Sequence, residues 1–265
     1  FWGDCSLSNV LYRYDAAKIE AVMVDAETSR LYGELTVGQR REDLEIMQVN
    51  LAGDMSDIAA SEGYDLEDAD LEIGLDITDR YVALWDELTT DLVIASNERY
   101  RIRERVGRLN DLGFAVDDVE IIPDGSSSLV RIAVSVGGRT FHSQRLRDLT
   151  GIDASENQAR QILSDMRYHR AKHGSSYDPD SKTARTVSAM NWRINRFEPF
   201  TARIAALRPG ADPIQEFCDY LNFRFALASD RGRDIDSAVA FEEWLEAGMP
   251  GFDPLITSQE QDSLP

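Results

Sequence analysis

The feature that most restricts the fold of this chain is a polar loop, then two short apolar segments, then an isolated acid. Asp4 and Asn9 lie five positions apart in the loop at residues 1–9. Residues 10–12 and 21–24 are apolar, and the polar stretch between them favours a turn, so residues 10–24 predict a hairpin of two strands. The hairpin ends at Asp25. This order is far more specific than the spacing of Asp4 and Asn9 alone.

Phosphoryl transfer requires the groups that this pattern provides. One carboxylate orients the acceptor hydroxyl and takes its proton, an amide oxygen helps to hold a metal ion, and a second carboxylate binds the metals that bridge the phosphates. In kinase folds the first two groups are an Asp and an Asn five residues later on one loop. The alternative is that Asp4 and Asn9 are turn residues and that Asp25 ends a strand by capping a turn.

Two strings of residues resemble a known family. They are Trp-Gly-Asp-Cys-Ser-Leu-Ser-Asn-Val-Leu at 2–11 and Val-Asp-Ala-Glu-Thr at 24–28. Both resemble actinobacterial lipopolysaccharide-kinase-like proteins of the Kdo/WaaP type, in which a C-terminal domain of unknown function follows the kinase-like module. The later segments that resemble this group are 39–53, 98–116 and 148–170. The resemblance covers most of the chain, but its sharp motifs lie within residues 2–28.

The resemblance implies a role for each matching residue. Asp4 would be the catalytic base, and Asn9 and Asp25 would hold Mg²⁺, with ATP as the phosphoryl donor. Gly3 before Asp4 is the small-molecule-kinase form of the loop, so the implied activity is an ATP- and magnesium-dependent phosphotransferase with an unknown acceptor substrate. Asp25-Ala26-Glu27 is likewise similar to the Asp-x-Glu element of small-molecule kinases.

Two departures from the family pattern keep other functions open. Trp2 stands where most kinases have a His that supports the loop, and Ser6 stands where protein kinases place a Lys that neutralises the phosphate. These departures favour a pseudokinase or a regulatory scaffold. A third hypothesis is a simple interaction module in which the Asp and Asn pattern is accidental.

The predicted fold class is α+β and mainly helical. The chain holds no glycine-rich phosphate loop and no Val-Ala-Ile-Lys-like strand, so we expect a piece of a longer protein that starts at the catalytic loop and is inactive by itself. Residues 1–95 are predicted to be the remnant of a protein-kinase-like C-lobe. Residues 96–255 are predicted to be a separate helical domain with a small antiparallel sheet, and residues 256–265 a frayed tail.

Hydrophobic periodicity predicts the elements of both parts. Predicted helices are 39–61, about 77–92, a third capped by Asn97 and ended by Gly113, a fourth opened by a Ser155–Gln158 capping box, then 183–207 with a kink or split at Pro199, 213–229 and 236–247. Residues 62–70 and 173–182 are predicted loops. Predicted strands are 119–122, 130–136 and 139–142. The aromatic side chains expected in the core are Trp192, Phe197, Phe200, Phe217, Phe223 and Phe225.

Composition restricts the partners. A net charge of −20 repels phosphate backbones, so nucleic acid is excluded as an expected partner, and a nucleotide would bind through divalent cations. No apolar run reaches the ~18 residues of a membrane span.

Cys5 and Cys218 form no disulfide framework, which favours a reducing cytoplasm. Cys5 is expected to be a small buried side chain rather than a nucleophile. Arg139, Arg145 and Arg147 either pair within the chain or receive an anionic partner, and the C-terminal domain is a candidate protein-binding part.

Overall fold

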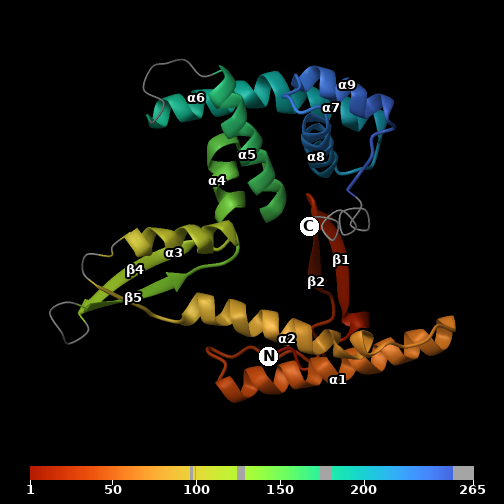
Figure 1. Ribbon diagram of the computed structural model, residues 1–265, viewed down its shortest axis with the longest axis vertical. Helices are drawn as coiled ribbons and strands as arrows, with labels where there is room; N and C mark the ends of the chain where they lie inside the picture. Colours follow the sequence, from red (N-terminus) through yellow and green to blue (C-terminus); the bar gives the residue numbers. More distant parts are fainter. Residues whose placement is uncertain (96–97, 99, 124–128, 174–180, 253–265) are drawn as a thin grey trace. The chain divides into compact units, whose positions relative to one another are not determined.

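The protein is a mainly helical α+β chain with small antiparallel sheets, as predicted (Figure 1). The computed structural model describes residues 1–95, 98, 100–123, 129–173 and 181–252. Contacts between residues divide the chain into two units, which are described separately. The first unit contains Phe1–Arg13, Glu20–Arg99 and Val119–Val134, and the second contains Tyr14–Ile19, Tyr100–Asp118 and Ser135–Pro265.

The first unit begins with the predicted loop and hairpin. A short 3₁₀ turn, η1 (Leu7–Asn9), leads into β1 (Val10–Asp15), which pairs with β2 (Lys18–Met23). The helix predicted at 39–61 is α1 (Val37–Glu62). A reciprocal capping box of Thr36 and Gln39 starts α1, and Gly63, with a φ of 76°, ends it in the left-handed conformation.

The second helix starts earlier than predicted. α2 spans Asp68–Thr89, so the loop expected at 62–70 is wrong over its last residues. Glu67 and Asp70 form a reciprocal capping box there, and acidic residues in a first turn also interact favourably with the helix dipole. The acidic composition of this segment predicts a solvated loop, but Glu67, Asp68 and Asp70 instead start helix α2.

Helices α1 and α2 pack closely against each other. A Cβ added to Gly74 on α2 would lie 2.9 Å from the Cα atom of Gln48 on α1, so only glycine allows this approach. Gln48 donates a hydrogen bond to Thr78 at 2.8 Å, and the Arg40 guanidinium lies 3.7 Å from the centre of the Trp85 ring. Polar and cation–π contacts thus supplement a small apolar seam.

A three-stranded sheet has the order β3-β5-β4, made of Leu92–Ala95, Leu129–Val136 and Val116–Pro123. β3 runs antiparallel to β5, from Leu92 opposite Ile132 to Ala95 opposite Leu129. The predictions of a helix reaching residue 92 and of a strand at 139–142 were wrong. The apolar run after α2 pairs with a distant strand, whereas Phe141 begins helix α4.

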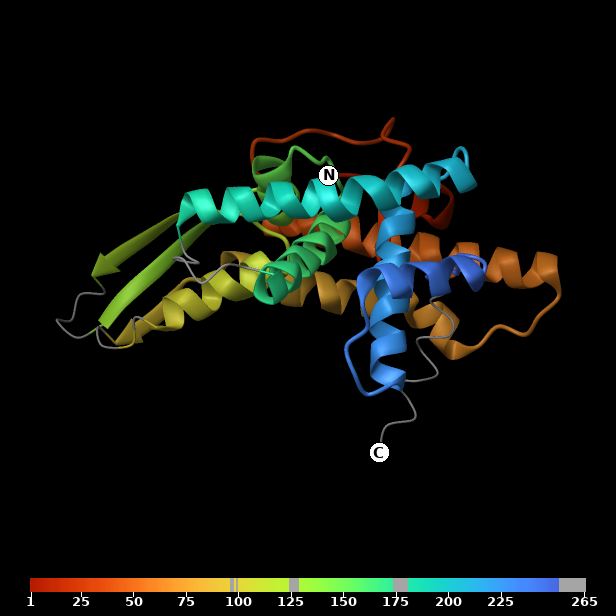
Figure 2. The ribbon, with the colours of Figure 1, turned by 90° about the horizontal axis from the view of Figure 1, so that it is seen from above.

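The second unit is built mainly from helices. They are α3 (Tyr100–Asp111), α4 (Phe141–Thr150), α5 (Glu156–His173), α6 (Lys182–Trp192), α7 (Glu198–Leu207), α8 (Pro213–Asp230) and α9 (Ser237–Glu246). A π-helical turn, η2 (Arg193–Phe197), joins α6 to α7 in one continuous helix (Figure 2). Regular α-helical bonding is interrupted by this turn just before Pro199, so the predicted helix is divided at Arg193–Phe197 rather than at the proline itself. The Asn97 cap, most of the 173–182 loop and the tail lie outside the described residues.

The predicted aromatic core is confirmed except at one position. Trp192, Phe197 and Phe217 are buried and contact one another with ring centres 5.1–6.1 Å apart. Phe200 stacks on Phe241 at 4.1 Å. Phe225, however, is 79% exposed.

The tip of the hairpin supplies a helix cap within the second unit. The Asp15 carboxylate is fully buried and accepts hydrogen bonds from the backbone amides of Asn157 and Gln158 at 3.0 and 2.8 Å. The Ser155 hydroxyl also donates to Asp15. Only half of the predicted Ser155–Gln158 capping box is present, the bond from the Ser155 amide to Gln158. The other half would be a bond from the Gln158 amide to the Ser155 side chain. That amide donates instead to Asp15, which lies 140 residues before Ser155.

Candidate functional site

The three residues predicted from the sequence lie around one open pocket of the first unit. Asp4, Asn9 and Asp25 line it, and its volume is about 410 Å³. α1 contributes the facing residues, which are Val49, Asn50, Gly53, Asp54 and Asp57. The hairpin returns the chain to its starting loop, so Asp25 comes to the same place as Asp4 and Asn9.

Helix α1 holds the loop in place through three side chains. The Asp43 carboxylate accepts hydrogen bonds from the backbone amides of Trp2 and Gly3, each at 2.7 Å. The Asp54 carboxylate accepts from the Leu7 amide at 2.7 Å. Carboxylate acceptors make strong hydrogen bonds, so these contacts fix the loop backbone on both sides of Asp4.

The third side chain of α1 contacts Asp4 itself. Asn50 Nδ2 donates to Asp4 Oδ1 and to the Cys5 carbonyl, both at 3.2 Å. Asn9 Nδ2 donates to the other carboxylate oxygen of Asp4 at 3.1 Å and to its carbonyl at 3.0 Å. The Asp4 carboxylate is therefore held by two amides. The sequence reasoning missed Asp43, Asn50 and Asp54. Asn50 lies about two helical turns after Asp43, and Asp54 about one turn after Asn50, so the three side chains share one face of the helix.

Trp2 connects the loop to the end of the hairpin. Its indole Nε1 donates to the Asp25 carbonyl at 3.1 Å, and its own carbonyl accepts from the Thr28 hydroxyl at 3.1 Å. Trp2 thus supports the loop and the end of the hairpin together. Gly3 has a φ of 81°, a conformation that favours glycine.

The donor atoms in the pocket suit a hard divalent cation. Asp25 Oδ1 accepts from the Glu27 amide at 3.1 Å, whereas its Oδ2 receives no hydrogen bond from the described residues. Among the described residues, Asn9 Oδ1 accepts a hydrogen bond from the Ser8 hydroxyl alone, at 3.4 Å. No group of three or more His, Cys, Asp or Glu side chains in the described part of the chain is placed to hold a metal. Mg²⁺ commonly takes one or two protein carboxylates and completes its shell with water and phosphates, so the residues fit that ion.

Cys5 does not have the properties of a nucleophile. Partial burial raises the pKa of its thiol, and the nearby Asp43 and Asp4 carboxylates raise it further. The thiol therefore stays protonated near neutral pH, and a thiolate is the reactive form. Cys5 and Cys218 are both free thiols.

The arginine island predicted at 139–147 makes contacts within the chain. Arg147 pairs with Asp153, and Arg139 donates to the Leu112 carbonyl at 3.0 Å. Across the described ranges, no helix is both long enough and apolar enough to cross a membrane.

Comparison with known proteins identifies one family. No curated protein sequence matches the chain, and neither does any solved structure. The model of a family described as "Domain of unknown function (DUF4032)" matches residues 83–249, which is more than half of the chain. The match fits the expected domain of unknown function and carries no information about a kinase. It begins before the predicted boundary at 95/96, which stays a prediction. The chain therefore belongs to the DUF4032 family.

Proposed function

We propose that the pocket around Asp4, Asn9 and Asp25 is the catalytic and metal-binding part of an ATP- and magnesium-dependent phosphotransferase of the small-molecule-kinase type. The observation that carries the proposal is the meeting of these three side chains around one open pocket. Asp4 and Asn9 share one loop, whereas Asp25 reaches the pocket only because the hairpin returns the chain to that loop.

Each residue has a defined task in this reaction. Asp4 orients the acceptor hydroxyl and takes its proton, and the amides of Asn9 and Asn50 hold its carboxylate for that purpose. Asn9 Oδ1 and Asp25 Oδ2 provide oxygen ligands for Mg²⁺, which neutralises phosphate charge when bound. A metal is needed here because the facing Asp54 and Asp57 would otherwise repel a nucleotide.

Metal binding tests the first step of the proposal. Mn²⁺ serves as a paramagnetic substitute for Mg²⁺, and the bound fraction is measured by electron paramagnetic resonance. Asp25→Asn should weaken Mn²⁺ binding at least about tenfold, because a charged ligand is lost. Asp79→Asn, an exposed acid on α2, is the matched control and should bind Mn²⁺ as the wild type does.

Catalysis is tested in the full-length protein. Magnesium-dependent ATP consumption should fall by about 10²–10⁴-fold in Asp4→Asn, because the general base is lost. It should fall at least as far in Asp25→Asn and stay unchanged in Asp79→Asn. Equal ATP consumption in the wild type and in both site variants would refute the proposal.

The second candidate is a pseudokinase or regulatory scaffold without catalysis. One feature favours it: Ser6 stands where protein kinases place a Lys that neutralises the phosphate. A wild-type protein that binds no Mn²⁺ and gains no thermal stability from ATP with Mg²⁺ would support the scaffold, since a ligand of the native state raises its apparent stability. The two free thiols agree with a cytoplasmic location for either candidate.

A further inference from the structure

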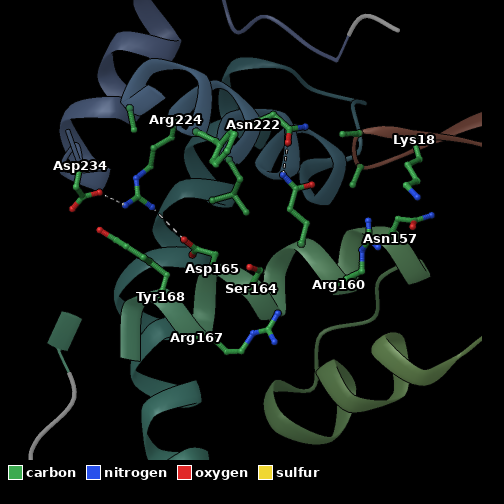
Figure 3. Close-up of a pocket in the computed structure, with 16 residues that line it drawn as sticks. Lys18, Asn157, Arg160, Ser164, Asp165, Arg167, Tyr168, Asn222, Arg224 and Asp234 are labelled. Atoms are coloured by element: carbon green, nitrogen blue, oxygen red, sulfur yellow. Dashed lines mark hydrogen bonds and ion pairs between the residues drawn. The ribbon is translucent and has the colours of Figure 1, made fainter. Parts of the chain in front are cut away.

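A larger pocket is formed entirely by residues of the second unit. It lies between α5, α8 and the hairpin tip, and its volume is about 800 Å³ (Figure 3). Small-molecule sites in proteins have volumes of about 300–1,000 Å³, are mostly apolar and carry a few polar groups that orient the ligand. No residue of the proposed phosphotransferase site lines this pocket.

One end of the pocket carries positive charge that the protein does not neutralise. Figure 3 shows Lys18 above Asn157 and Arg160 at this end. The Lys18 side chain makes no hydrogen bond or ion pair with any residue that the structure describes. Arg160 donates one long hydrogen bond, of 3.5 Å, to the Asp111 carbonyl. Partial burial lowers the pKa of Lys18, and the nearby Arg160 and Arg139 lower it further, against an opposing effect of Asp15.

Other cations of the second unit do have carboxylate partners. Arg203 on α7 pairs with Glu242, and Arg208 and Arg231, which directly follow α7 and α8, pair with Glu216 and Glu243. In a chain with a net charge of −20, acids are abundant. Lys18 and Arg160, which have no carboxylate partner among the described residues, repel each other, and a bound anion would relieve that repulsion.

The acids at the other end of the pocket are already neutralised. Asp165 is buried and forms ion pairs with Arg196 at 2.9 Å and Arg224 at 3.3 Å. Asp234 pairs with Lys172 at 2.8 Å and with Arg224 at 3.3 Å. Figure 3 shows Asp165, Arg224 and Asp234 connected at this end. These carboxylates therefore do little to repel an anion at Lys18 and Arg160.

The wall supplied by α8 has an apolar part beside Asn222 and Arg224. Leu221, Phe225 and Ala228 line it, and Ala16 adds to it from the hairpin tip. Phe225 is 79% exposed, although it lies within a long helix that has many buried residues. Exposed aromatic area at a concavity is unfavourable in water, at about 25 cal/mol per Å², and a ligand with an apolar body would cover it.

We infer that this pocket binds a small organic anion, with a phosphate or carboxylate group at Lys18 and Arg160 and an apolar body against Phe225. A small organic anion fits because the pocket combines two cations that lack a carboxylate partner, Lys18 and Arg160, with the exposed ring of Phe225. An inorganic anion would use only the cationic end, and a neutral lipid-like molecule only the wall.

Isothermal titration calorimetry with the whole chain tests the inference. The probes are hexyl phosphate, hexanoate, inorganic phosphate and neutral hexanol. We expect hexyl phosphate or hexanoate to bind, and the tighter of the two identifies the head group. Hexanol should not bind measurably.

Variants separate the two halves of the site. Lys18→Gln and Arg160→Gln should each weaken binding of the hexyl anion about tenfold, because each removes a charge-assisted contact. Phe225→Ala should weaken the hexyl anion but leave inorganic phosphate unchanged. Arg203→Gln, which removes one exposed charge from α7, is the control and should bind as the wild type does.

Two results would overturn the inference. One is the absence of binding by both hexyl anions at millimolar concentration in a protein with the wild-type circular dichroism spectrum. The other is binding that Lys18→Gln and Arg160→Gln leave unchanged. Neither result depends on metal binding or ATP consumption, so the outcome is independent of the proposed phosphotransferase activity.

Discussion

Replacing Asp219 by asparagine should stabilise the second unit at neutral pH and have little effect in acid. Asp219 lies on α8 and is buried, and this burial raises the pKa of its carboxyl from 3.8 to about 6. Glu216 raises the pKa further, whereas hydrogen bonds from Gln215 and the Phe252 amide, and the charge of Arg208, lower it.

The direction of the pH effect follows from proton binding. Between pH 3.8 and about 6 the folded protein holds a proton on Asp219 that the unfolded chain has released. The free energy of unfolding therefore falls as pH rises through this window, and the loss is complete above it. The pKa difference corresponds to about 3 kcal/mol at 1.36 kcal/mol per pH unit. An asparagine side chain would keep the acceptor oxygen that Gln215 and Phe252 use, at 3.0 and 3.3 Å, but would carry no charge.

The assay is urea unfolding between pH 4 and pH 8, followed by the fluorescence of the buried Trp192 and Trp244. Asp219→Asn should gain about 2–3 kcal/mol over the wild type at pH 8, and the gain should vanish towards pH 4. Asp230→Asn, an exposed acid at the end of the same helix, should show no such trend. Two results would refute the reasoning. In one, the stability difference between Asp219→Asn and the wild type is the same at every pH. In the other, this difference is smaller at pH 8 than at pH 4.

Three further substitutions test the packing of the two units. Asp15→Asn should destabilise the second unit by about 1–3 kcal/mol, because an amide replaces the buried acceptor of several donors. Hydrogen exchange at the start of α5 should become faster, and exchange at the wild-type rate would count against the cap. Gly74→Ala should lower the stability of the first unit by roughly 1–3 kcal/mol in thermal unfolding, because the added Cβ would meet the Gln48 Cα. This loss should exceed the gain from the higher helix propensity of alanine, and unchanged stability would contradict the close approach. Asp165→Ala should cost about 3–5 kcal/mol in urea unfolding, because two buried guanidinium groups lose their carboxylate, and a loss under about 1 kcal/mol would be inconsistent with the pairing.

Local patterns in the sequence were sufficient for the parts of this protein that depend on neighbouring residues. The apolar segments around residues 10–24 predict the hairpin, and the hairpin by its geometry returns Asp25 to Asp4 and Asn9. The helical periodicity of residues 39–61 predicts α1 within two residues at its start and one at its end. Both signals are local, since strand alternation and helical repeats are properties of consecutive residues.

The tertiary structure decided everything that joins residues far apart in the chain. Asp43 and Asp54 support the loop, and Asp15 caps α5, but each is an ordinary acid in its own segment. β3 pairs with a strand that begins only at Leu129, so local periodicity assigns its apolar run to the end of a helix. The pocket at Lys18 and Phe225 likewise needs a hairpin tip and a helix about 200 residues away. The sequence by itself determined which side chains can do chemistry, whereas the fold determined which of them meet, because hydrogen bonds and ion pairs depend on distance in space.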